Sequence, residues 1–303
     1  MRKLFVIILF VGLLNAKEIT PSVVYSQVML ITDEIHFLLK HYGIDHAHEK
    51  IIKRNIVNSK LKPRNVWQKS YEIMIKINIL RSEHGLPIVK PVNMTPVLNL
   101  NPNLVYEQTQ RILTELEIFK FRNHIESPRF KVKEYKNKTP LDVFNGLNHI
   151  SMALDEINQI GFTPSYVFAE NMRVYEDITA ILHYLDIEDK TIPAKKNINA
   201  TPNDTFNTAL KTLEKIKQLQ MSASIDYVDF NSFRKKKQTP SDVFSMTQMI
   251  IAELQTIKAY IGLNIVLRSA DDYISKTPVE VDQLMSWNLR KLNLIKNLSK
   301  GNQ

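Results

Sequence analysis

Apolar residues recur in this chain at fixed distances after eight prolines. The prolines are Pro21, Pro63, Pro102, Pro140, Pro164, Pro202, Pro240 and Pro278, with spacings of 42, 39, 38, 24, 38, 38 and 38 residues. When each proline is counted as position 0, positions 3, 10, 14 and 17 are mostly apolar. Position 14 is always isoleucine or leucine: Ile35, Ile77, Leu116, Leu154, Ile178, Ile216, Leu254 and Leu292. This alternation of four- and three-residue steps predicts eight helices that pack through a coiled-coil seam.

Polar signals mark where each helix begins and ends. A threonine precedes the proline in six copies, and Asp or Glu follows two residues after it in four of these, as in Thr139-Pro140-Leu141-Asp142. Threonine and the acid can cap the first turn, and proline at the first helical position loses no hydrogen bond. Gly43, Gly85, Gly161 and Gly262 fall 21 or 22 residues after their prolines, where glycine commonly ends a helix. We therefore expect helices of about 21 residues, roughly 30 Å long.

The spacing of the copies indicates an internal duplication. The connector between copies four and five, Gly161-Phe162-Thr163, is short, and the other connectors are long. Pairing copies one to four with copies five to eight gives offsets of 143, 139, 138 and 138 residues. The sequence thus predicts an all-α protein made of two duplicated four-helix units, with boundaries at 1–16 (signal peptide), 17–161 and 162–303.

The packing within each unit has two solutions. About ten extended residues retrace a 30 Å helix, so successive helices can run parallel, with the connectors returning along the outside. Alternatively, each connector holds a second short helix, and the chain forms an α-solenoid of helical hairpins. We favour two four-helix bundles. The repeat length is close to that of tetratricopeptide repeats, but their Trp, Gly, Tyr and Ala pattern is absent.

The N-terminus is typical of a secretory signal peptide. Arg2 and Lys3 precede an apolar run from residue 4 to residue 14, and Ala16 is a suitable cleavage-site residue. Eleven apolar residues are too few to span a bilayer core of about 30 Å, although an uncleaved N-terminal anchor is the alternative. We expect an exported, periplasmic protein that begins near Lys17 and has no transmembrane segment in its mature form.

Composition narrows the function classes. The chain carries a net charge of +9, and removal of Arg2 and Lys3 leaves +7, which favours anionic envelope surfaces over nucleic acid as partners. It has no cysteine, hence no thiol nucleophile and no disulfide. We find no GxSxG, phosphate-binding glycine loop or HExxH motif. The sequence therefore favours a protein that is not an enzyme and needs no cofactor.

Three sets of residues are candidates for binding. The first lies in the connector after the first helix, where two imidazoles beside a carboxylate either bind a divalent metal weakly or form an ordinary solvated connector, which we favour: His46, His48 and Glu49. The second is the column at position 4, which is aromatic in seven copies: Tyr25, Trp67, Tyr106, Phe144, Phe168, Phe206 and Phe244. The column predicts a layer near the helix N-termini that either packs against the connectors or lines an apolar pocket.

The third set is basic and lies just before three of the helix starts. Its members are Lys136, Lys138, Lys195, Lys196, Arg234, Lys235, Lys236 and Lys237. If the helices of a unit are parallel, these side chains gather at one end, where the helix dipoles add partial positive charge. The set predicts either an anion-facing surface or ordinary solvated charge.

These features give two functional hypotheses. The first is an exported, non-enzymatic interaction or scaffold protein of the cell envelope, because the helical surface is repetitive and charged and carries no catalytic motif. The second is a periplasmic small-molecule binding protein that uses the aromatic layer. The sequence names neither the partner nor the ligand.

Overall fold

A computed structural model describes residues 18–44 and 60–298, and within them the chain is all-helical, without strands. Each of the eight described α-helices begins at one of the eight prolines, as predicted. They are α1 (Pro21–His41), α3 (Pro63–Glu83), α4 (Pro102–Arg122), α5 (Pro140–Ile157), α6 (Pro164–Tyr184), α7 (Pro202–Ser222), α8 (Pro240–Ile261) and α9 (Pro278–Leu292). A short 3-10 turn, η1 (Asn231–Phe233), precedes α8.

Four of the six threonines that precede a helix-starting proline form the predicted caps. Thr139, Thr201, Thr239 and Thr277 form reciprocal capping boxes with the acid three residues later. In the copies without that acid, Thr20 and Thr163 make no side-chain cap bond.

The helix ends share one backbone conformation at position 22, whether or not glycine is present. The residues with left-handed φ there are Gly43, Gly85, His124, Asp186, Ser224 and Gly262. In each case the following apolar residue donates its N–H back to the carbonyl of position 18, for example Ile125 to Lys120 at 2.9 Å. This bond satisfies an orphan carbonyl of the last turn, so the stop does not depend on glycine.

Gly161 does not have the helix-ending role that the sequence predicted. We expected it to end the fourth helix, but α5 ends at Ile157, and the left-handed residue is Gln159. A side chain at residue 161 would place its Cβ 2.7 Å from the hydroxyl of Ser241. A larger residue there would therefore displace the hydroxyl of Ser241 at the start of α8.

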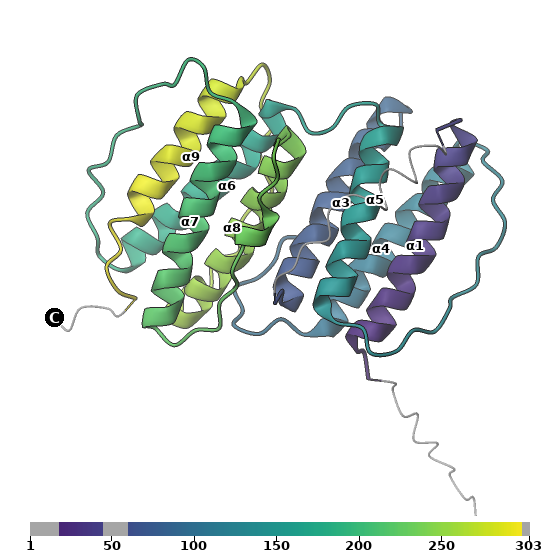
Figure 1. Ribbon diagram of the computed structural model, residues 1–303, viewed down its shortest axis with the longest axis horizontal. Helices are drawn as coiled ribbons and strands as arrows, with labels where there is room; N and C mark the ends of the chain where they lie inside the picture. Colours follow the sequence, from purple (N-terminus) through teal and green to yellow (C-terminus); the bar gives the residue numbers. More distant parts are fainter. Residues whose placement is uncertain (1–17, 45–59, 299–303) are drawn as a thin grey trace, which may run out of the picture.

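The eight helices form two bundles (Figure 1). In the first bundle, α1 and α3 both pack against α4 and α5; in the second, α6 and α7 both pack against α8 and α9. One shallow pocket is lined by the first four prolines and by the valines three positions after them, Val24, Val66, Val105 and Val143. All four helices therefore begin at the same end and run parallel, and the second bundle repeats this arrangement. Parallel four-helix bundles, the arrangement we favoured over a hairpin solenoid, are confirmed.

A second pattern, in polar residues, holds neighbouring helices in register. The side chain at position 18 of one helix contacts the side chain at position 13 of a helix beside it in the bundle. The e and g positions that flank the seam of a parallel coiled coil pair in the same way. The pairs are Lys120–Glu34 and Arg81–Glu115 in the first bundle, and Lys258–Asp177 and Gln220–Glu253 in the second. The same neighbour relation in both bundles supports the duplication.

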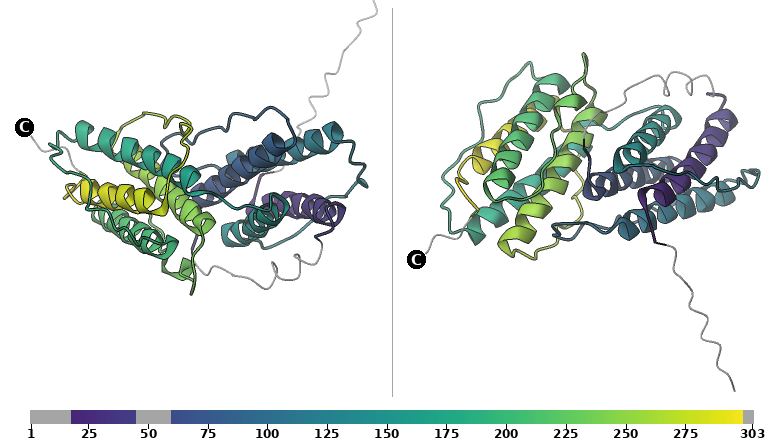
Figure 2. Two further views of the ribbon diagram at one scale, coloured as in Figure 1. Left: turned by 90° about the horizontal axis from the view of Figure 1, so that it is seen from above. Right: turned by 60° about the horizontal axis from the view of Figure 1, so that its bottom comes forward.

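The two bundles lie side by side and point in opposite directions (Figures 1 and 2). The short link after α5 starts α6 at the end of the molecule where α5 finishes. Between the bundles, α3 packs against α8. Arg64 near the start of α3 bonds Glu253 in the second half of α8, so these two helices are antiparallel.

Candidate functional site

The junction between α3 and α8 buries a long continuous stretch of both helices. Every residue of α3 from Arg64 to Met74 is buried, as is every residue of α8 from Met246 to Lys258. A helix with one partner face buries only a stripe, so complete burial shows that each of these helices is covered on two sides.

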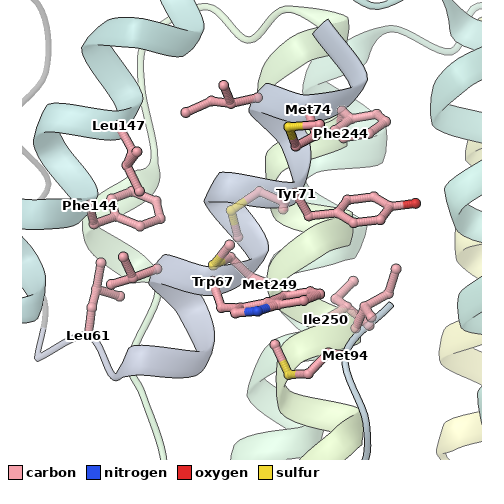
Figure 3. Packing of buried hydrophobic residues seen from close by; sticks show 14 of the residues in the cluster. Leu61, Trp67, Tyr71, Met74, Met94, Phe144, Leu147, Phe244, Met249 and Ile250 are labelled. Carbon is pink, nitrogen blue, oxygen red and sulfur yellow. The ribbon is translucent and has the colours of Figure 1, made fainter. Parts of the chain in front are cut away.

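Apolar side chains fill the centre of this junction. In Figure 3, Trp67 and Tyr71 of α3 point toward the side where Met249 and Ile250 of α8 lie. Phe144 of α5, with Leu147, lies on the opposite side of α3. Trp67 and Tyr71 stack with their ring centroids 6.4 Å apart. The central part of α3 therefore contributes to the first bundle on one face and to the junction on the other.

Arg173 of α6 ties the junction to two connectors. Its guanidinium donates to Tyr71 Oη at 2.8 Å, to Asn93 Oδ1 at 2.9 Å and to the carbonyl of Arg268 at 3.0 Å. It also pairs with Glu170, which accepts the hydroxyl proton of Tyr71. Burial raises the pKa of Tyr71, so this hydroxyl stays protonated and able to donate.

A buried ionic cluster surrounds Glu253 of α8. Arg64 donates to both carboxylate oxygens at 2.9 Å, and Asn65 adds a bond at 2.8 Å. Gln220 of α7 donates to the same carboxylate at 2.8 Å. Bidentate pairing and two amide bonds compensate for the loss of water around a charge, so this cluster holds the bundles in one register.

A second cluster surrounds Glu72 of α3. Its carboxylate accepts bonds from Lys69, from Ser151 of α5 and from Ser245 of α8, at 2.7, 2.5 and 2.6 Å. Burial by itself raises the pKa of Glu72, but the ammonium groups of Lys69 and Lys76 outweigh it, and the pKa falls below its usual value. Glu72 is therefore ionised at neutral pH.

Beside this cluster lies a cavity of about 220 Å³. Both bundles contribute to its wall, together with the connector that carries η1. The lining residues are Lys69, Phe144, Asn148, Phe206, Ser232, Phe233, Arg234, Lys235, Asp242, Ser245 and Met246.

Specific contacts hold the connector over the cavity. Phe233 packs edge-on against Phe144, with ring centroids 5.6 Å apart. Arg234 donates to Asn207 Oδ1 at 2.7 Å, and Lys235 pairs with Asp242 at 2.7 Å. The cavity wall is thus fixed by bonds from three helices and one connector.

The structure divides the aromatic column among several environments. Phe144 and Phe206 line the cavity, and Trp67 lies in the junction. Phe244 stacks on Phe162 with centroids 3.7 Å apart. Tyr106 is partly buried beside the core of the first bundle.

The two remaining aromatics, at the first helix of each bundle, make equivalent contacts. Tyr25 packs edge-on against Tyr135 beneath Lys138, and Phe168 packs the same way against Tyr273 beneath Lys276. Both ring pairs have a centroid distance of 5.0 Å, and both lysines lie 4.6 Å from the ring centroid. The duplication therefore preserved this contact between helix and connector.

The basic candidates fall into two groups because the bundles point in opposite directions. Lys136 and Lys138 precede α5 in the first bundle, whereas the other six precede α7 and α8 in the second. Most are exposed: Lys136, Lys195, Lys196, Arg234, Lys236 and Lys237. Arg234 and Lys235 reach the cavity. Two of the basic candidates and two of the aromatic ones therefore meet at one place.

The histidine candidates cannot be placed in the same way, because His46, His48 and Glu49 lie outside the described residues. Within residues 18–44 and 60–298, no group of three or more potential metal-ligating side chains is present. Over the same residues, no helix has the length and apolar character needed to cross a membrane.

Sequence reasoning missed Lys69, Phe233 and Met246. A signal was present in α3, where Trp67 and Tyr71 lie on one flank of the apolar seam and Lys69 lies on the other. Large side chains outside the seam indicate a second packing face.

Comparisons with protein families, curated proteins and solved structures find no match to this chain.

Proposed function

We propose that this chain is a non-enzymatic binding protein that holds a small organic molecule between its two bundles. The observation that carries the proposal is the cavity of about 220 Å³ whose wall combines aromatic and charged side chains from both bundles. Ligand sites occur preferentially at domain interfaces and join apolar walls with a few placed polar groups. The volume is below the usual range for drug-sized ligands, so the proposed ligand is small.

The chemistry of the wall supports binding over catalysis. Its one carboxylate, Asp242, already accepts bonds from Thr239 and Lys235. Its buried cation, Lys69, is bonded to Glu72 and Ser245. Groups that are engaged in this way orient a ligand, whereas a general base needs a free acceptor within reach of the substrate proton.

A thermal-shift screen with a panel of small metabolites tests the proposal. A ligand that binds only the folded state at ten times its Kd adds about 1.4 kcal/mol, which raises Tm by several degrees. The cavity-filling variant Asn148→Phe should lose that shift, whereas Gln218→Phe, which adds the same ring on an exposed face of α7, should keep it. Failure of every compound to shift the unaltered protein would overturn the proposal.

An interaction or scaffold function in the envelope is the second candidate. It is favoured by the exposed lysines near the start of α7 and α8: Lys195, Lys196, Lys236 and Lys237. We expect retention on phosphatidylglycerol vesicles that falls steeply with salt and is reduced when these four lysines become glutamine. No retention at low salt would exclude an anionic lipid surface as the partner.

We also propose that the protein is exported to the periplasm, because its basic and apolar N-terminal residues are typical of a signal peptide. That segment lies outside the described residues. N-terminal sequencing of the protein from a periplasmic fraction should find a start near Lys17. A start at Met1 in the cytosolic fraction would contradict export.

A further inference from the structure

The cavity described above has an excess of positive charge around it. Its lining carries three cations, Lys69, Arg234 and Lys235, and one carboxylate, Asp242. The carboxylate is already paired with Lys235 at 2.7 Å. Behind the wall, Lys76 pairs with Asp155 at 2.6 Å, and Glu72 lies 2.7 Å from Lys69.

Counted together, this neighbourhood holds four cationic side chains and three carboxylates, so it is net positive when all are ionised. Burial raises the pKa of Asp155 and lowers the pKa of Lys69, so it weakens one charge of each sign and leaves the balance unchanged. This surplus attracts an anion and repels a cation, and water screens the part of it that comes from the exposed Arg234.

Lys69 is the cation best placed to meet such a ligand. Its side chain is 2% exposed, and its ammonium donates to Glu72 at 2.7 Å and to Ser245 Oγ at 3.1 Å. An ammonium has three donors, so one remains beyond these two bonds. Since Lys69 and Ser245 both line the cavity, the third donor is available to a molecule inside it. Burial lowers the pKa of Lys69, so a bound anion would stabilise its charged form.

The other side of the cavity suits a flat apolar group. Phe144, Phe206, Phe233 and Met246 supply this part of the wall. Lys69 Nζ lies 5.8 Å from the centroid of the Phe144 ring, so charge and ring surface are within the span of one small molecule. The volume of 220 Å³ equals that of about seven water molecules, or roughly ten non-hydrogen atoms of an organic compound.

We infer that the ligand is a small aromatic or otherwise flat organic anion whose acidic group bonds Lys69 and whose ring packs among Phe144, Phe206 and Phe233. This inference rests on the proposed binding function and adds the chemical class of the ligand. In this arrangement Lys69 determines the preference for an anionic ligand over a neutral one.

Matched acid and amide probes test the inference: benzoate against benzamide, and phenylacetate against phenylacetamide. Each pair keeps shape and changes charge. In isothermal titration of the full mature chain, we expect at least one acid to bind ten-fold or more tightly than its amide. Lys69→Met should remove that preference and leave the affinity for the amide nearly unchanged. Lys211→Met, which removes an exposed lysine from α7, should leave both affinities unchanged.

The outcomes separate the two proposals. Equal binding of acids and amides by the unaltered protein would overturn the anion inference and leave the binding function standing. Absence of binding by these probes and by every compound of the metabolite panel would overturn both. If Lys69→Met unfolds, Lys235→Gln at the partly exposed edge of the cavity replaces it. Lys235→Gln should then weaken the acid at least three-fold, and an unchanged preference for the acid would contradict a role for the cationic wall.

Discussion

The second helix of each bundle, α3 in the first and α7 in the second, shows how one repeat acquires two different surroundings. Both begin with proline, share Ile at position 14 and Leu at position 17, and pack against the equivalent two neighbours. Yet α3 is buried without interruption from Arg64 to Met74, whereas α7 exposes Lys211 and Glu214 on its outer face.

The difference lies in the residues outside the seam. Position 8 is Tyr71 in α3 and Leu210 in α7, and position 9 is Glu72 in α3 and Lys211 in α7. The partner helix differs in the same way, because position 9 is Met249 in α8 and Arg111 in the equivalent helix α4. The seam builds a bundle in both halves, and the outer face then decides which helices join the bundles.

The largest expected effect comes from giving α8 the residue that α4 has at position 9. Met249→Arg places a charge in a site with no exposed surface and no partner, so we expect the free energy of unfolding to fall by more than about 4 kcal/mol. Arg111→Met, on the partly exposed face of α4, should change it by less than about 1 kcal/mol. Urea denaturation measures both. A similar effect of the two substitutions would show that the α3–α8 contact is not a buried interface.

The second largest effect is expected at position 13, which is Glu253 in α8 and Glu115 in α4. Glu253→Gln leaves Arg64 buried without its ion-pair partner, and we expect a loss of about 3–5 kcal/mol. Glu115→Gln removes the partner of Arg81, but the side chain of Glu115 is 11% exposed against 1% for Glu253, so water relieves part of the cost. We expect its loss to be less than half as large. Equal losses in urea denaturation would contradict the special burial of the junction.

Helix caps give a smaller contrast between copies. The Thr239 hydroxyl accepts the N–H of Asp242, and Thr239→Ala should cost about 1 kcal/mol. Thr20 makes no such bond, so Thr20→Ala should cost less than about 0.3 kcal/mol. Thermal unfolding monitored by circular dichroism distinguishes them. The idea that the acid at the third position creates the working cap fails if Thr20→Ala is the more damaging change.

The smallest effect depends on pH. Bonds from the Thr201 hydroxyl and backbone N–H lower the pKa of Asp204 below its ordinary value near 3.8. A carboxyl with a lowered pKa stabilises the folded state above the unfolded-chain value, and this contribution disappears as the pH falls through the folded-state pKa. Asp204→Asn should therefore lower the free energy of unfolding by about 0.5 kcal/mol at pH 7, limited by solvent screening, and by almost nothing near pH 2. A larger loss at pH 2 than at pH 7 would contradict the sign.

Local features were predictable because their signals lie within one helix length. The proline starts, the threonine caps and the seam at positions 3, 10, 14 and 17 all follow from contacts between residues a few positions apart or one turn apart. At His124, Asp186 and Ser224 glycine, the usual marker of a left-handed stop, is absent, and the apolar residue that follows each is the local signal that remains. Gly161 was misassigned because its role depends on Ser241, 80 residues away.

The binding candidates were only partly predictable. Phe144, Phe206, Arg234 and Lys235 were in the predicted sets, but the sequence offered no reason to choose them from fifteen aromatic and basic residues. What selects them is the position of the η1 connector against α5 and α8, fixed by the Phe144–Phe233 and Lys235–Asp242 contacts. Lys69 could not be identified from its own helix, because its importance comes from the cavity wall that the other bundle completes.

The sequence by itself determined eight helices, their starts and a duplicated seam, since capping, heptad spacing and chain connectivity are local or periodic properties. It left open whether the helices of a unit run parallel, and it did not indicate how the two units meet. Only the tertiary structure decided that α3 packs antiparallel to α8, through bonds such as Arg64–Glu253 that join residues 189 positions apart. Such contacts have no periodic signature in the chain, because they depend on the complementarity of two outer faces that meet only after both bundles have formed.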